Sequence, residues 1–264
     1  MPPIIGQYVP GNSIIHRLDP RSKLIAVFIF IIVIFLANSF ISYAVVTLFV
    51  AGAVLLSRVP ILFVLRGMKW IFILVMITFL LHLFLTKEGE VIYQIGTWKI
   101  YSEGLILGSF ISLRLLYLVI FTSLLTLTTT PIEITDGLES LLNPLKRLRV
   151  PVHEFALMMS IALRFIPTLL EEAEKIMKAQ SARGADFTGG PLKERLKAIV
   201  PLLIPLFVSS FKRAEDLALA MEARGYRGGE GRTKLRILTW GWKENVLMLL
   251  LVALTLALVW LRWF

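Results

Sequence analysis

About five apolar runs dominate the sequence, and each is long enough, or nearly long enough, to cross a lipid bilayer. A transmembrane helix needs about 20 consecutive, mainly apolar residues. The composition points the same way, because 57% of the residues are hydrophobic and only 17% are charged, whereas soluble domains are richer in charge. We therefore predict an all-α membrane protein with about five transmembrane helices. The runs are 24–37, 40–56, 70–85, 105–127 and 246–261.

Basic residues set the predicted orientation of these helices. The net charge is +10, and most Lys and Arg lie beside the apolar runs or in one central block, where they contact anionic lipid headgroups. We therefore expect membrane lipid as a partner and no nucleic acid. The basic segments alternate between two sides of the membrane. This pattern places the N-terminus and the block 128–243 in the cytoplasm and the C-terminus outside.

The same pattern divides the chain into three parts. Residues 1–127 form an N-terminal membrane domain with four spans, residues 128–243 form cytoplasmic or interfacial helices, and residues 244–264 form a C-terminal transmembrane helix. We see no removable signal peptide in residues 1–18. The sequence has no cysteine, which excludes disulfides and thiolate metal sites.

Two long helical patterns fill most of the central block. After a short helix over 132–145, they cover 152–182 and 192–223 and are separated by a Gly- and Pro-containing break at 188–191. Their first halves are apolar and belong at or in the membrane, and their second halves are amphipathic. We expect one stripe on each helix to cover the other, so that the helices cross just below the membrane. The stripes are Leu169, Ala173, Ile176, Met177 and Gln180, and Phe211, Ala214, Leu217, Ala218 and Met221.

Four residues are candidates for helix packing or for contacts with a partner membrane protein. Pro167, Pro201 and Pro205 lie within the long helical patterns and should kink them toward the cytosol. Arg114 lies about ten residues into the fourth run, roughly 15 Å deep. A charge at that depth is a functional hypothesis by default. The alternative is a bond to a backbone carbonyl or a polar side chain that fixes helix packing.

A repeated tripeptide ends the two long patterns. Ala182-Arg183-Gly184 closes the first and Ala223-Arg224-Gly225 closes the second. Aligning the two arginines also aligns identical residues at three earlier positions, which makes the two segments similar copies of one unit. The pairs are Ala173 with Ala214, Glu174 with Glu215, and Ala179 with Ala220.

The repeated tripeptide predicts a guanidinium held at the tip of a stiff helix. Glycine commonly follows a helix end because it adopts the left-handed conformation at little cost. The preceding arginine then complements the negative end of the helix dipole. Its planar fork suits a carboxylate or backbone carbonyls in a groove of a partner. Ordinary helix capping, and contacts of Arg183, Arg224 and Arg227 with lipid phosphates, are the alternatives.

Four short motifs resemble one known family. The order and spacing of these motifs along the chain are similar to those of the transmembrane T component of energy-coupling factor (ECF) transporters, which import vitamins and metal ions with ABC-type ATPases. The motifs are Leu18-Asp19-Pro20-Arg21-Ser22-Lys23-Leu24, Leu163-Arg164-Phe165-Ile166-Pro167, Ala179-Gln180-Ser181-Ala182-Arg183-Gly184-Ala185-Asp186 and Glu222-Ala223-Arg224-Gly225-Tyr226.

The resemblance implies a coupling role in a bacterial or archaeal plasma membrane. Arg183 and Arg224 would each insert into a groove on one of two ABC-type ATPase subunits. The crossed helices would transmit motion to a separate substrate-binding membrane subunit, the S component. The chain itself would bind no cofactor, because ATP would be bound by the partner subunits.

The sequence offers no sign of catalysis. It has no His-Glu-x-x-His, Gly-x-Ser-x-Gly or Walker motif, and we interpret His16, His82 and His153 as structural or interfacial. The acidic residues near 171–174 and 215–216 are interpreted as a solvated helix face rather than a metal site. A self-contained secondary transporter, a membrane-embedded enzyme and a membrane scaffold remain open as alternatives. The repeat disfavours a secondary transporter, because the repeats of such a transporter lie within the membrane and this one is predicted outside it.

Overall fold

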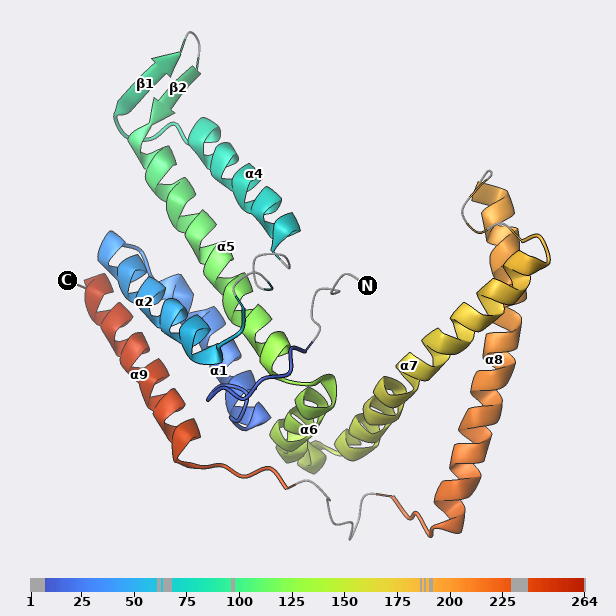
Figure 1. Ribbon diagram of the computed structural model, residues 1–264. Coiled ribbons are helices and arrows are strands. Elements are labelled where there is room, and N and C mark those ends of the chain that lie inside the picture. The colour runs from blue at the N-terminus through green and yellow to red at the C-terminus, as the bar shows by residue number, and fades with distance from the viewer. Residues whose placement is uncertain are drawn as a thin grey trace. The chain divides into compact units, whose positions relative to one another are not determined.

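The computed structural model describes residues 8–60, 63, 68–95, 98–185, 187, 189, 192–228 and 237–263. Within them nearly all regular structure is α-helical, with one small two-stranded sheet (Figure 1). This confirms the predicted all-α class. The chain forms two compact units, Met1–Leu141 together with Leu238–Phe264, and Leu142–Ile237. The predicted division at 127/128 and 243/244 into membrane and cytoplasmic parts stays a prediction.

The first unit is a helical bundle whose core lies around α1. Phe30 of α1 stacks on Phe121 of α5 with ring centroids 4.2 Å apart, and the buried Val46 of α2 and Leu251 of α9 belong to the same cluster. Its elements are α1 (Pro20–Val33), the 3₁₀ turn η1 (Ile34–Leu36), α2 (Phe40–Ser57), α4 (Lys69–Leu85), α5 (Ser102–Thr128), α6 (Pro131–Leu142) and α9 (Trp242–Trp263).

Local capping explains where three of these helices begin. Asp19 caps α1 because its carboxylate accepts a hydrogen bond from the Arg21 amide at 2.8 Å, with Pro20 at the first helical position. Ser39 caps α2 in the same way through the Ser42 amide. At the start of α9, Glu244 Oε2 accepts from the Gly241 amide at 2.9 Å, as the acidic residue of a capping box does.

The predicted spans differ in how completely they form. Three of them, α2, α5 and α9, have 18, 27 and 22 residues and are long and apolar enough to cross a membrane, and the 31-residue helix Val152–Ala182 also meets this condition. The third run forms α4, which has 17 residues. The first run forms the 14-residue α1 and then tightens into η1. Between the second and third runs, the short apolar stretch 61–65 would suit a re-entrant or interfacial piece, and all of it except Phe63 lies outside the described residues.

A β-hairpin joins α4 to α5, in the segment between the third and fourth apolar runs, for which we predicted no regular structure. β1 (Val91–Ile95) pairs antiparallel with β2 (Trp98–Tyr101), and the register shifts between Val91 and Tyr93. Beside it, the Glu90 amide donates to Ser102 Oγ at 3.1 Å. Figure 1 shows the hairpin at the end of the α4–α5 helix pair.

The second unit contains the two long helices with the predicted bounds. α7 covers Val152–Ala182 and α8 covers Leu192–Ala223, after the 3₁₀ segment η2 (Asn143–Leu148). The short helix predicted over 132–145 ends earlier, because α6 stops at Leu142 and η2 continues the chain. Most of the predicted break at 188–191 lies outside the described residues.

Candidate functional site

The ends of α7 and α8 are built in the same way. After α7, the Gly184 amide donates to the Ser181 carbonyl and the Ala185 amide donates to the Gln180 carbonyl, both at 3.0 Å. After α8, the Gly225 amide donates to Glu222 at 2.8 Å and the Tyr226 amide donates to Met221 at 3.0 Å. These paired bonds, one closing across three residues and one across five, define the Schellman motif. The repeat in the sequence is therefore a repeat of structure.

Glycine is required at both ends by the backbone angle. Gly184 has a φ of +91° and Gly225 a φ of +70°, in the region where side-chain-bearing residues are strained. Space does not impose the requirement. Among the described residues, no heavy atom outside the immediate chain neighbours lies within 4 Å of a Cβ built at either position. The two glycines thus stop their helices and leave the surroundings of the tips open.

Each Schellman motif presents one arginine to the surroundings. Arg183 and Arg224 occupy the position between the last helical residue and the glycine, and both are exposed, as are Ala182 and Ala223. Within the described part of the chain, neither guanidinium has an ion-pair partner. Two equivalent cations thus lie at two equivalent helix ends. Asp186, the last residue of the motif after α7, lies outside the described residues.

The helices that carry these tips contact each other near their middles. Leu169 and Ala173 of α7 lie beside Leu206 and Ser210 of α8 around a shared hollow of about 370 Å³. Figure 1 shows the two helices crossing each other. The stripe predicted on α7 is largely confirmed, since Leu169, Ala173, Ile176 and Gln180 are half-buried.

An ion pair lies beside this contact. Arg213 Nη2 of α8 donates to Glu172 Oε2 of α7 at 2.7 Å, and the two side chains are 41% and 24% exposed. Arg213 Nε also approaches Ser209 Oγ at 3.5 Å. The pair therefore links polar residues of both helices along the seam where they meet.

The stripe predicted on α8 is wrong for three of its five residues. Phe211, Ala214 and Ala218 are exposed, whereas Leu217 and Met221 are half-buried. The seam on α8 instead follows residues mostly spaced by three or four positions. It includes polar side chains, because Arg213 pairs with Glu172 of α7 and Ser210 lines the hollow between the helices. Its half-buried members are Leu202, Leu206, Ser209, Ser210, Arg213, Leu217 and Met221.

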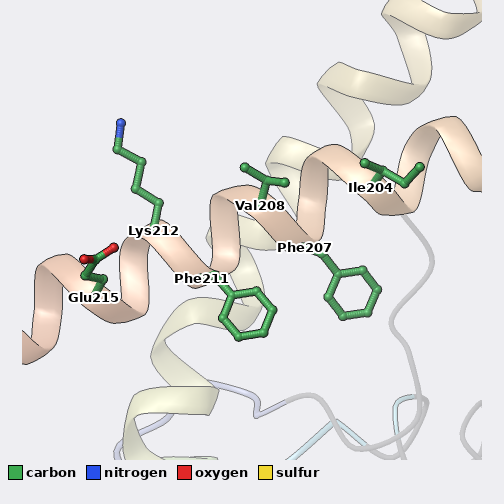
Figure 2. A pocket seen from close by; sticks show the side chains of 6 residues that line it. All are labelled: Ile204, Phe207, Val208, Phe211, Lys212 and Glu215. Atoms are coloured by element: carbon green, nitrogen blue, oxygen red, sulfur yellow. The ribbon is translucent and has the colours of Figure 1, made fainter.

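The larger apolar side chains of α8 form an open patch. Phe207 is 59% exposed and Phe211 71% exposed, and Figure 2 shows their rings one turn apart on the same side of the helix. Lys212 and Glu215 border the patch. Contiguous exposed apolar surface of this kind marks an interaction site with protein or lipid. We define the α8 patch as Ile204, Phe207, Val208 and Phe211.

The three prolines lie inside the long helices. Pro167 is within α7, and Pro201 and Pro205 are within α8. All three are exposed, and both helices continue past them. The kinks that the sequence predicts at these positions stay a prediction.

Arg114 bonds to a backbone carbonyl of the first unit. Its Nη2 donates to the Ala37 carbonyl at 3.0 Å, and its guanidinium carbon lies 5.0 Å from the centroid of the Phe35 ring. The Arg114 side chain thereby joins α5 to the turn between α1 and α2. Backbone pairing of this type is the packing alternative considered from the sequence.

A buried polar network that sequence reasoning missed joins three chain segments. Lys23 Nζ donates to the Thr128 carbonyl and to Thr129 Oγ1, both at 3.0 Å. The Asp19 amide donates to Glu244 Oε1 at 3.0 Å. The start of α1 is therefore tied both to the end of α5 and to the start of α9. Only the motif around Asp19 and Lys23 hinted at this role.

The described residues contain no group of three or more His, Asp or Glu placed to hold a metal ion. The ring of His16 bonds to Ser13 Oγ at 2.6 Å and to the Val9 carbonyl at 3.0 Å. His82 Nδ1 lies 2.9 Å from the Thr78 carbonyl within its own helix. These two histidines thus have local partners.

Comparisons with known proteins agree with this architecture. A family model described as a cobalt transport protein, CbiQ, matches residues 11–235. The energy-coupling factor transporter transmembrane protein EcfT of Bacillus subtilis (strain 168) is 63% identical over 98% of both chains. The protein of the same name from Exiguobacterium sibiricum is 57% identical over the same share. Since the family model and these relatives cover most of its length, the chain belongs to the EcfT family of transmembrane components of ECF transporters.

Proposed function

We propose that this chain couples two ABC-type ATPase subunits to a substrate-binding S component, and that the assembly imports a vitamin or a metal ion. The ATPases bind and hydrolyse ATP, so that this chain needs no cofactor of its own. Recognition of the substrate resides in the S component. The chain is then the mechanical link between the subunit that releases energy and the subunit that carries the substrate.

The observation that carries the proposal is the pair of matched helix ends. Arg183 and Arg224 have the same place in the same Schellman motif, and two copies of one docking element fit two similar partners. A guanidinium at the carboxyl end of a helix suits a groove that offers a carboxylate or backbone carbonyls. The open space around Gly184 and Gly225 gives a partner surface room to close around each tip.

The α8 patch supports the second half of the proposal. Its four apolar residues are all more than half exposed, and they lie on one of the helices that carry the arginine tips. A hydrophobic membrane subunit seated there would be moved by any displacement of the tips. The Glu172–Arg213 pair and the seam between α7 and α8 would make the two helices move together.

The proposal fixes an orientation. The N-terminus, α7 and α8 are on the cytoplasmic side of a bacterial or archaeal plasma membrane, where the ATPases have access to ATP. The β-hairpin and the C-terminus of α9 are then on the outer side. The excess of Lys and Arg in the segments assigned to the cytoplasm supports this orientation.

Affinity purification of the tagged full-length chain from its native membranes in mild detergent tests the proposal. We expect two ABC-type ATPase polypeptides, or two copies of one, together with a small hydrophobic membrane protein, all identified by mass spectrometry. The α8 variant F207S/F211S should lose the small membrane protein and keep the ATPases. Recovery of the chain without ATPases would refute the coupling role.

A further inference from the structure

A cavity of about 650 Å³ opens on the first unit, and all of its lining residues belong to that unit. Its floor is formed by buried residues of α1 and α5, such as Val27 and Leu124. Its open side lies between α2 and α9, where Leu48 and Leu250 line the cavity and are 78% and 48% exposed. The size falls in the range of small-molecule sites in proteins, about 300–1,000 Å³.

The cavity has one polar end. Lys23, Thr128 and Lys243 line it where α1 and α9 begin and α5 ends. From Lys243 to Leu250 the wall on α9 extends for about 10 Å at 1.5 Å per residue, which is about one third of the hydrocarbon thickness of a bilayer. Trp242, 71% exposed, lies at the same end, as interfacial tryptophans do.

The two lysines at this end differ in what they already bind. Lys23 Nζ donates to three oxygens, namely the His16 and Thr128 carbonyls and Thr129 Oγ1. Lys243 lies 6.0 Å from the centroid of the Trp242 ring, and within the described residues it has no ion pair. The neighbouring carboxylate, Glu244, accepts bonds from the Asp19 and Gly241 amides. Lys243 is therefore the cation that remains available.

We propose that this cavity binds one anionic phospholipid, with its phosphate at Lys243 and the upper part of an acyl chain between α2 and α9. Basic pockets between transmembrane helices bind anionic headgroups. An acyl chain gains little hydrophobic free energy by leaving the surrounding lipid, so the headgroup charge selects this lipid over neutral ones. The lipid fills the gap that α1, α2, α5 and α9 leave in their packing.

Gly52 makes the acyl site testable. It lines the cavity, and no heavy atom of the described residues beyond its own helical turns lies within 4 Å of a Cβ built there. Gly52→Leu therefore adds a side chain that enters the cavity, and its Cβ meets no neighbouring atom of the described residues. Ala51→Leu is the matched control, because Ala51 is the exposed neighbour on the same helix and does not line the cavity.

The experiment is native mass spectrometry of the full-length chain in mild detergent with equal amounts of dioleoylphosphatidylglycerol and dioleoylphosphatidylcholine. We expect wild type and A51L to retain one phosphatidylglycerol in preference to phosphatidylcholine. G52L should retain neither lipid. K243Q should lower the preference about fivefold, the effect of one lysine near an anionic headgroup, and K178Q on α7 should leave it unchanged.

Three results would overturn the lipid site. Equal retention of both lipids by wild type would show that the charge selects nothing. Undiminished phosphatidylglycerol binding by G52L would place the lipid elsewhere. If circular dichroism shows that G52L has lost helix content, undiminished phosphatidylglycerol binding by K243Q would have the same meaning. The wild-type chain could also co-purify with other subunits and without lipid. If G52L then loses one of these subunits, the cavity would be assigned to a partner protein.

Discussion

The arginine tips depend on the glycine that follows each of them. Gly184 and Gly225 have positive φ angles, and a residue with a side chain in that conformation costs about 1–2 kcal/mol. No neighbouring atom in the described part of the chain would obstruct the new Cβ. A substitution there therefore weakens the helix end without removing any side-chain contact, and the orientation of the arginine changes with it.

Gly184→Ala should fray the end of α7. The two bonds to Ser181 and Gln180 would open more often, by about 5–30-fold for a loss of 1–2 kcal/mol. Trypsin cleavage after Arg183 measures this opening, and its rate should rise by a similar factor. Gly184→Asn is the control, because asparagine tolerates the left-handed region. Equal cleavage rates for G184A and wild type would mean that the glycine does not hold this end.

Arg114 should contribute to the stability of the first unit. Arg114→Leu removes the donor to the Ala37 carbonyl, and an unsatisfied buried acceptor costs about 1–3 kcal/mol. We expect a lower thermal unfolding midpoint in detergent. Arg114→Lys should restore stability only in part, because an ammonium does not reproduce the planar contact with Phe35. An R114L midpoint equal to that of wild type would contradict this role.

Residues whose role depends on their neighbours along the chain could be predicted from the sequence. Residues that bond to a distant part of the chain could not. Gly184 and Gly225 were predicted because a left-handed residue after a helix is a short-range requirement. The bond from the Asp19 amide to Glu244 joins residues 225 positions apart, and no spacing rule indicates it. From the sequence, Lys23 was only one residue of the motif at 18–24, whereas the structure shows that it bonds to the end of α5.

At the scale of elements, α7 and α8 are linked by one ion pair at their seam. Glu172→Ala or Arg213→Ala should each weaken the association of the two helices. The coupling energy from a double-mutant cycle should be favourable but small, because both side chains are partly exposed and solvent screens their attraction. Thermal unfolding midpoints of the four proteins measure it, and the value should fall at high salt. Strict additivity of the two single substitutions would show that the ion pair does not couple the helices.

Helix bounds were easier to predict than helix faces. The limits of α7 and α8 followed from apolar periodicity together with the glycine after each helix. The face of α8 was misassigned because Phe211 suggested burial, whereas the seam uses Ser210 and Arg213. Apolarity alone does not distinguish the face that meets a neighbouring helix from a face left open for a partner. The β-hairpin was missed because its strands have only five and four residues.

At the scale of the whole molecule, the orientation in the membrane is open to direct measurement. The chain has no cysteine, so a single-cysteine variant can be made without first replacing native cysteines. A membrane-impermeant maleimide should label E88C, before the β-hairpin, on intact cells. It should label S181C, near the end of α7, only after permeabilisation. Both chosen positions are exposed. The reverse labelling pattern would invert the proposed topology.

The central claim is that Arg183 and Arg224 dock onto ATPase subunits, and charge reversal tests it most directly. In the reconstituted transporter, R183E and R224E should each weaken ATPase retention by about 2 kcal/mol or more, as expected for a desolvated charge pair, and R183E/R224E should abolish ATP-driven uptake. R227E, which reverses an exposed charge beyond the second tip, should leave both properties near wild type. Assembly with ATPases and normal uptake by R183E/R224E would contradict the account.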